Sequence, residues 1–240
     1  MTKFIKIGVL CFVAFIGYSL ISDILGPEKM LRYLENKYDK EFVIENLEDL
    51  TLAERTSDKL IAHPKGEKDL PFLVYYDNQD TYLLSIWEQE VKEELTSAME
   101  NIFGFEVPFN VSILMRNDMY DMSHFDMSFS DYVKDVNQSG FLIIVLALPS
   151  IYEPEDYADE IYQVFQLLEL YGMDSYSVST GFVDDDFDTE EYLRTAGISN
   201  IGWSNFYKGV KGHLIINDLS KIETLSDIID NYQENTYYES

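Results

Sequence analysis

The sequence predicts an α+β fold: an N-terminal transmembrane helix followed by a mixed-sheet ectodomain. Three observations lead to this prediction. An uncharged apolar run lies near the N-terminus, strand and helix patterns then mix irregularly, and 46% of the 240 residues are hydrophobic. This hydrophobic content supports a buried core, and the lack of a regular βαβ repeat favours α+β over α/β.

The N-terminal segment predicts a membrane anchor. Residues 7–22 carry no charge, and Lys3 and Lys6 precede them. At about 1.5 Å per residue the run is slightly short of a ~30 Å hydrocarbon core, and residues 4–5 extend it if the Lys6 ammonium reaches the head groups. The flanking lysines place the N-terminus in the cytoplasm. We therefore expect residues 4–25 to contact the membrane in a single-pass protein whose C-terminal domain is extracytoplasmic.

Two alternatives for this segment stay open. Gly17-x-Ser19 loosely matches a signal-peptide cleavage site, and the run is also compatible with a buried helix of a soluble protein. Lipidation of Cys11 is disfavoured, because Val9 and Leu10 precede it and the apolar run continues past it. Cys11 is the single cysteine, which excludes an intramolecular disulfide and a cysteine metal cluster.

The first part of the ectodomain begins after Gly26-Pro27, which ends the apolar helix. Residues 27–40 predict an amphipathic helix, because Met30, Leu34 and Tyr38 share one face. Alternation predicts a strand over 41–47, and 51–58 is a polar connection. Strands over 59–63 and 70–76 are joined by a Pro/Gly/Lys turn. Helical spacing of apolar residues then predicts a helix over 84–103, which Gly104 ends, and a strand follows over 106–115.

The second part starts with residues 116–129 (RNDMYDMSHFDMSF), which show no period and predict a loop or short helix. Eight consecutive apolar residues over 141–148 predict a central strand covered on both faces. Apolar periodicity predicts helices over 154–171, 188–195 and 219–232, a strand over 175–183, and extended segments over 198–206 and 213–216. We place a soft boundary in residues 117–129, which gives an anchor (1–26), a first α+β half (27–116) and a second, more acidic α+β half (117–240).

The charge of the chain indicates its partners. The formal net charge is −27, and from Asn117 onward there are 24 acidic and 5 basic side chains. This half repels the phosphates of nucleic acids, so no nucleic-acid partner is expected, and it attracts cations and basic peptides or proteins. The plainer interpretation is that the charge only keeps the domain soluble.

Two segments resemble a known group of proteins. Residues 33–47 (YLENKYDKEFVIENL) and 76–95 (YDNQDTYLLSIWEQEVKEEL) are similar to uncharacterised membrane-anchored or lipoprotein-like envelope proteins of Gram-positive bacteria. The resemblance covers about the first third of the exported part. It implies a cell-envelope location and core positions for Tyr38 and Phe42, and it implies no activity.

Two acidic clusters are candidate metal ligands. Asp184, Asp186, Asp188 and Glu190 have the spacing that opens a calcium loop, but Thr189 and Thr195 stand where Gly and a bidentate Glu are needed, so at most weak Ca²⁺ binding is expected. The second cluster is a His with carboxylates, which ligate Zn²⁺ or Mn²⁺; its members are Asp121, His124 and Asp126. The alternative interpretations are a capped helix N-terminus and a solvated loop.

The sequence carries no recognisable catalytic motif. G-x-S-x-G, H-E-x-x-H, G-x-x-x-x-G-K-[ST] and G-x-G-x-x-G are all absent. Carboxylates at 153–160 have the composition of an acid/base pair, but acids in a first helical turn have an ordinary explanation in the helix dipole. We therefore expect a non-enzymatic, membrane-anchored protein-interaction domain. The alternatives are a cation-binding or metal-dependent hydrolytic envelope domain and an immunity-type inhibitor of a basic toxin.

Overall fold

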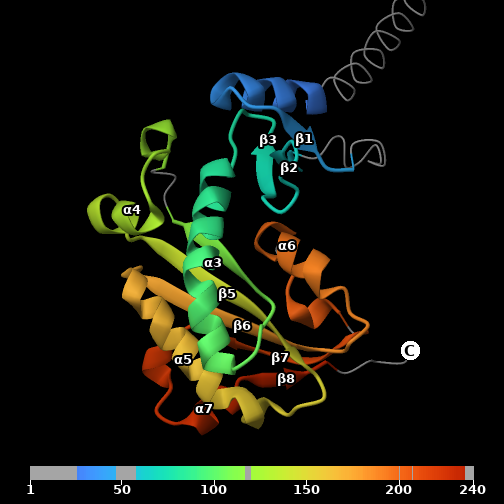
Figure 1. Ribbon diagram of the computed structural model, residues 1–240, viewed down its shortest axis with the longest axis vertical. Coiled ribbons are helices and arrows are strands. Elements are labelled where there is room, and N and C mark those ends of the chain that lie inside the picture. Colours follow the sequence, from blue (N-terminus) through green and yellow to red (C-terminus); the bar gives the residue numbers. More distant parts are fainter. Residues whose placement is uncertain (1–25, 47–57, 117–119, 200, 207, 236–240) are drawn as a thin grey trace, which may run out of the picture. The chain divides into compact units, whose positions relative to one another are not determined.

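The computed structural model describes residues 26–46, 58–116, 120–199, 201–206 and 208–235. Figure 1 shows a mixture of helices and two separate sheets, one of three strands and one of five. The α+β class is thereby confirmed. The chain divides into two compact units, Met1–Tyr82 and Leu83–Ser240.

Unit 1 is a helix on a small antiparallel sheet. The helix covers residues 26–38, and the strands β1 (Phe42–Ile44), β2 (Lys59–Pro64) and β3 (Phe72–Tyr75) follow in the order β1-β2-β3. Met30 and Leu34, on the predicted helix face, are buried. The core is aromatic, with rings in contact at 4.8–5.8 Å: Tyr38, Phe42, Phe72 and Tyr82. The core position implied for Phe42 is therefore confirmed.

Unit 2 is built on a five-stranded sheet in the order β4-β5-β6-β7-β8. Its strands are β4 (Phe109–Met115), β5 (Gly140–Pro149), β6 (Ser175–Val183), β7 (Val210–Ile216) and β8 (Tyr232–Glu234). Only β5 and β6 are parallel, and the other neighbours are antiparallel. The apolar run predicted as a central strand is β5, between β4 and β6. Parallel strands need a crossover, and α5 (Ala158–Leu168) supplies it.

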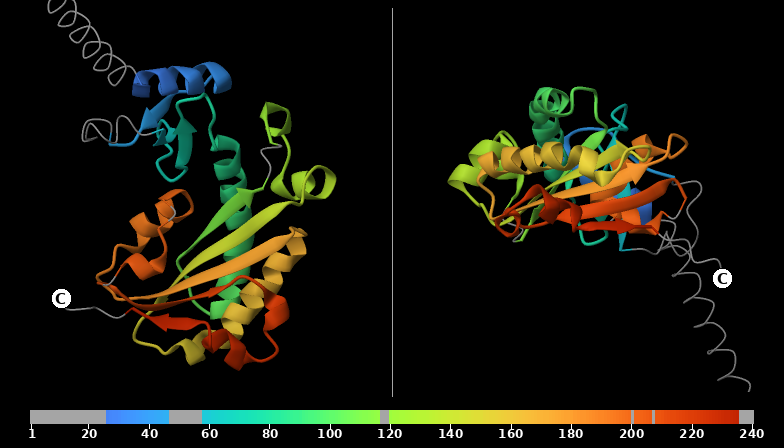
Figure 2. Two further views of the ribbon diagram at one scale, coloured as in Figure 1. Left: turned by 180° about the vertical axis from the view of Figure 1, so that it is seen from behind. Right: turned by 90° about the horizontal axis from the view of Figure 1, so that it is seen from below.

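Helices cover one face of this sheet, as the right-hand view of Figure 2 shows for α3 and α5. They are α3 (Tyr82–Phe103), α4 (Phe129–Asp135), α5 and α7 (Leu225–Ile229). Alternation along the strands directs Leu142, Ile144 and Leu146 of β5 to this side, where all three are fully buried. The larger of the two cores in unit 2 lies here.

The opposite face has a second, smaller core under α6 (Thr189–Ser199). Val145 and Ala147 of β5 contact Tyr192 and Trp203, and the latter pair of rings lies 4.1 Å apart. Gly181 of β6 makes this packing possible. A Cβ at that position would lie 2.3 Å from the indole of Trp203, closer than any real contact.

Three predicted features differ from the structure. The extended segment predicted at 198–206 is wrong, because α6 continues to Ser199 and Trp203–Asn205 form a 3₁₀ turn that places the indole on the sheet. The single helix predicted at 219–232 is also wrong. Leu219–Lys221 is a 3₁₀ turn, a capping box at Thr224 starts α7, and β8 follows. Helix α4 begins only at Phe129, the last residue of the segment predicted as a loop or short helix, and continues to Asp135 through residues for which no element was predicted.

The division into units also differs from the boundary predicted at 117–129. β4, before that boundary, pairs along its whole length with β5, after it, so the two halves 27–116 and 117–240 share one sheet. The predicted anchor at 1–26 and the polar connection at 51–58 fall mostly outside the described residues. Among the residues that are described, no helix is both long and apolar enough to cross a bilayer.

Candidate functional site

Two acidic loops of unit 2 meet at the end of the sheet where the strands β5 and β6 finish. Because β5 and β6 are parallel, their carboxyl ends lie side by side, an arrangement that often carries binding sites in proteins with parallel strands. Ser150, directly after β5, donates its backbone N–H to the carbonyl of Val183 at 2.8 Å and its hydroxyl to the carboxylate of Asp184. The loops after β5 and β6 are therefore tied together.

The loop after β5 exposes apolar side chains beside carboxylates. Ile151 is 75% exposed and Tyr152 is 45% exposed. Glu153 then begins a 3₁₀ turn, Pro154–Tyr157, with its N–H donated to the carboxylate of Asp156 at 3.1 Å. Acidic side chains at such a position stabilise the first turn of a helix. The Lys211 ammonium lies 3.0 Å from Glu153 and forms an ion pair with it.

Aromatic rings pack beneath the exposed side chains of the loop after β5. The buried Tyr157 contacts the ring of Tyr152 edge-on at 5.6 Å and that of Phe105 at 6.4 Å. Phe103, at the end of α3, lies 6.0 Å from Phe105 and 6.1 Å from Tyr157. Phe105 is 39% exposed. We call the exposed side chains of Phe105, Ile151 and Tyr152 the aromatic patch.

The residues predicted as a calcium loop are exposed, and two of them have structural roles. Asp184 accepts the hydroxyl hydrogen bond of Ser150, and Asp188 caps α6 by accepting the N–H of Glu191 at 3.1 Å. Asp186 and Glu190 point into solvent. In the described part of the chain, no three His, Cys, Asp or Glu side chains converge as metal ligands. Weak Ca²⁺ binding stays a prediction.

The second predicted cluster forms a capped turn. Asp121 accepts the N–H of Ser123 at 2.8 Å, and the N–H of Asp121 is donated to Nδ1 of His124 at 3.1 Å. Nδ1 also lies 3.3 Å from Oδ1 of Asp121, so this ring nitrogen faces groups of its own turn. Asp126 is exposed. The three residues are brought into one short loop, and their hydrogen bonds favour the interpretation as a solvated turn.

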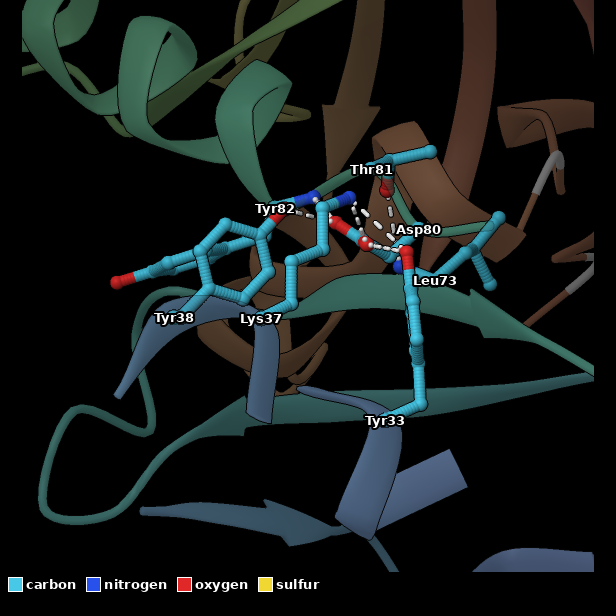
Figure 3. Close-up of polar contacts among 7 residues, drawn as sticks. All are labelled: Tyr33, Lys37, Tyr38, Leu73, Asp80, Thr81 and Tyr82. Atoms are coloured by element: carbon cyan, nitrogen blue, oxygen red, sulfur yellow. Dashed lines mark hydrogen bonds and ion pairs between the residues drawn. The ribbon is translucent and has the colours of Figure 1, made fainter. Parts of the chain in front are cut away.

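The most highly connected carboxylate of unit 1 is Asp80 (Figure 3), with only 1% of its side chain exposed. Oδ2 accepts the hydroxyl of Tyr33 and the ammonium of Lys37, both at 2.7 Å. Oδ1 accepts the hydroxyl of Tyr38 at 2.7 Å and the backbone N–H of Tyr82 at 3.0 Å.

These four bonds hold the helix over 26–38 against the turn before α3. Because they use the acceptor capacity of the Asp80 carboxylate, it has no free lone pair for a ligand. Burial, followed by the charge and hydrogen bond of Asp80, raises the pKa of Tyr38 far above its ordinary value. Burial and the hydrogen bond to Asp80 likewise raise the pKa of Tyr33, so Tyr33 and Tyr38 both remain hydrogen-bond donors at physiological pH. We assign this cluster a structural role.

Carboxylates of α3 form a second set of internal contacts, in unit 2. Glu88 accepts the backbone N–H of Ile113, on the edge strand β4, at 2.8 Å. Burial raises the pKa of Glu88 to about 8, and this hydrogen bond opposes the rise. Glu90 accepts the first N–H of α4, at Phe129, at 3.2 Å. These groups satisfy backbone donors that otherwise lack partners.

Sequence reasoning identified the acidic loops but missed the aromatic patch. The sequence predicts only that Tyr157 lies in a helix over 154–171, and nothing in it indicates that Phe105 and Tyr152, 47 positions apart, contact the same ring. The sequence carried little signal for Asp80, because the helix was predicted to begin at residue 84, whereas α3 begins at Tyr82, where Asp80 accepts the backbone N–H. Its three side-chain donors come from another segment and could not be predicted.

Comparison with known proteins gives one distant similarity. No protein-family model matches the chain, and no curated protein resembles it in sequence. Among solved structures, a DUF5037 family protein from Ruminococcus gnavus aligns with a TM-score of 0.44 and 14% identity, over 80% of this chain and 89% of that one.

Proposed function

We propose that this protein is a membrane-anchored, extracytoplasmic domain that binds a basic protein or peptide. The observation that carries the proposal is the distribution of charge between the two units. Residues 83–240 hold 30 acidic and 7 basic side chains, a formal charge of −23, whereas residues 1–82 hold 14 and 10, a charge of −4. Nearly all the excess charge therefore belongs to unit 2.

The cations of unit 2 do little to offset this excess. They number only seven, and among the described ion pairs are those of Arg194 with Glu191, Lys211 with Glu153 and Lys221 with Asp218. A surface of this kind accelerates encounter with a positively charged partner and disfavours nucleic acids and other acidic proteins. The membrane part of the proposal is supported by residues 7–22 and the lysines before them.

Binding is tested with the full-length chain in detergent micelles and a fluorescent peptide rich in Lys and Arg. We expect the affinity to fall steeply as salt rises from about 50 to 300 mM, because screening shortens the range of charge interactions. A peptide of the same length rich in Asp and Glu is the matched control. Failure to bind any basic peptide or basic protein at low salt, or binding that ignores salt, contradicts the proposal.

Topology is tested separately. Protease added to intact cells should digest residues 27–240 if the domain is extracytoplasmic, and the membrane fraction should retain the chain after a high-salt wash. A domain protected in intact cells but digested after lysis would place it in the cytoplasm. Release of the chain into the medium, with a new N-terminus near Ser19, would instead support a cleaved signal peptide.

A further inference from the structure

The aromatic patch places exposed rings on the strongly acidic unit 2. Single exposed apolar residues are common, but contiguous ones mark interaction surfaces. The rings of Phe105 and Tyr152 both contact the ring of Tyr157, so these two exposed side chains lie in one area, and the exposed Ile151 precedes Tyr152 in the chain. They come from the segment after α3 and the loop after β5.

The patch is held rigidly before any partner arrives. Tyr157 and Phe103 beneath it are each only 8% exposed, and their rings contact each other at 6.1 Å. The hydrogen bonds of Ser150 and the capping box at Glu153 fix the backbone on both sides of Tyr152. Aromatic side chains that are already ordered lose little entropy on binding, which is typical of residues that dominate binding energy.

Exposed carboxylates neighbour the members of the patch in the chain and indicate the chemistry of its partner. Glu106 follows Phe105 in the chain, and Glu155 and Asp156 follow Tyr152 within four residues; all three are exposed. The hydrogen bond from Ser150 brings the loop that starts at Asp184 to the same edge. The Lys211 ammonium neutralises Glu153. The exposed acids of these segments outnumber this one cation, so the surface that carries the patch is anionic.

We propose that the aromatic patch binds an arginine-bearing segment of the basic partner, with guanidinium groups stacked on Tyr152 and Phe105 and paired with Glu155 or Asp156. This inference rests on the proposed function. A guanidinium is planar, stacks on aromatic rings and donates two parallel hydrogen bonds to one carboxylate, whereas an ammonium is a compact, strongly hydrated point charge. The patch therefore selects arginine over lysine at equal charge.

The test measures the affinity of the full-length chain in micelles for two labelled ten-residue peptides of equal charge, one with Arg and one with Lys, alternating with Gly and Ser. We expect the Arg peptide to bind at least about 5-fold more tightly. Tyr152→Ala and Phe105→Ala, which leave the charge unchanged, should each weaken Arg-peptide binding about 5- to 30-fold. Tyr152→Leu, which keeps an apolar side chain without a ring, should reduce the preference for Arg, and the double variant Tyr152→Leu/Phe105→Leu should abolish it.

Matched controls separate the patch from general effects. Leu170 is 81% exposed and has no part in the patch, so Leu170→Ala should bind both peptides as the wild type does. Glu155→Gln should weaken binding more than Asp230→Asn, which removes an equal charge from the end of α7. The fluorescence of Trp87 and Trp203 reports whether each variant is folded.

The outcomes distinguish the two proposals. Binding of both peptides with equal affinity, unchanged by Tyr152→Ala and Phe105→Ala, overturns the arginine site and leaves the basic partner standing. Loss of binding in Leu170→Ala as large as that in Tyr152→Ala also overturns the site. Failure of the wild-type chain to bind either peptide at low salt overturns the proposed function, and the arginine site with it.

Discussion

Asp80→Ala should destabilise unit 1 while leaving unit 2 folded. The substitution removes the acceptor of three side-chain hydrogen bonds and one backbone hydrogen bond. Lys37 loses its charge partner, and the hydroxyls of Tyr33 and Tyr38 lose their acceptor at a partly buried site. Leaving such groups unpaired costs more than the bonds contribute when they are made.

The size of the effect follows from burial. Removing one partner of a buried ion pair costs about 3–5 kcal/mol. The Asp80 side chain is 1% exposed, but that of Lys37 is 28% exposed, so the ammonium can recover part of its hydration and the lower end of the range applies. A loss of about 3 kcal/mol corresponds to roughly a 100-fold change in an equilibrium constant.

Hydrogen exchange of the full-length chain measures this change unit by unit. The slowest amides of residues 26–38, β2 and β3 should exchange about 100-fold faster in Asp80→Ala, because they exchange through opening of unit 1. Both tryptophans, Trp87 and Trp203, lie in unit 2, so their fluorescence should show an unchanged unfolding transition.

Asp77→Ala is the matched control for this experiment, since Asp77 is exposed in the turn three residues earlier. It should leave exchange in unit 1 nearly unchanged. Equal protection of the helix in wild type and Asp80→Ala would refute the structural role assigned to the buried carboxylate.

Three further predictions concern unit 2. The pKa of Glu88 is raised to about 8 from an ordinary 4.5, so its protonated carboxyl contributes stability that is complete below pH 4.5 and is lost as pH rises through 8. Glu88→Gln should therefore become progressively more stable than the wild type over that interval in urea titrations. A constant difference in stability between the two proteins would contradict this prediction. Gly181→Ala should cost about 1–3 kcal/mol, since its Cβ meets the indole of Trp203, and should shift the fluorescence spectrum; an unshifted spectrum would mean that the indole packs elsewhere. A thermal melt in chelator and then with Ca²⁺, Mn²⁺ or Zn²⁺ tests the metal prediction: a rise in melting temperature at micromolar metal, lost in Asp186→Asn or His124→Ala, would support it, and no rise would exclude it.

Local patterns predicted most of the elements because burial on one side imposes a period on the sequence. The helix α3 and the strands β2, β3, β5 and β6 were identified within a few residues. The failures came where the period was ambiguous. The apolar residues of 198–206 lie two or three positions apart and fit no single period, and Trp203 needs a tight turn to reach Gly181. Residues 219–232 contain a second cap at Thr224, which starts a separate helix.

The sequence predicted the acidic composition of the two candidate metal-binding loops, and it also predicted the ordinary explanation that their carboxylates cap turns. Asp188 does cap α6, and Asp121 caps a 3₁₀ turn. The adjacency of the loops was not readable, because it depends on β5 and β6 being parallel neighbours. Residues 51–58 and the predicted anchor lie largely outside the described residues, so those predictions stand as they were made.

The sequence by itself determined the class of fold, the position of most elements and the excess of negative charge, since each depends on which residue types occur and at what local spacing. Only the tertiary structure decided which carboxylates are buried and which rings meet. Asp80 became the centre of unit 1 because Tyr33, Lys37 and Tyr38 approach it from more than 40 positions away. Phe105 and Tyr152 became one surface because Tyr157 packs between them. Contacts over such separations depend on how elements stack around a core, and no local pattern encodes them.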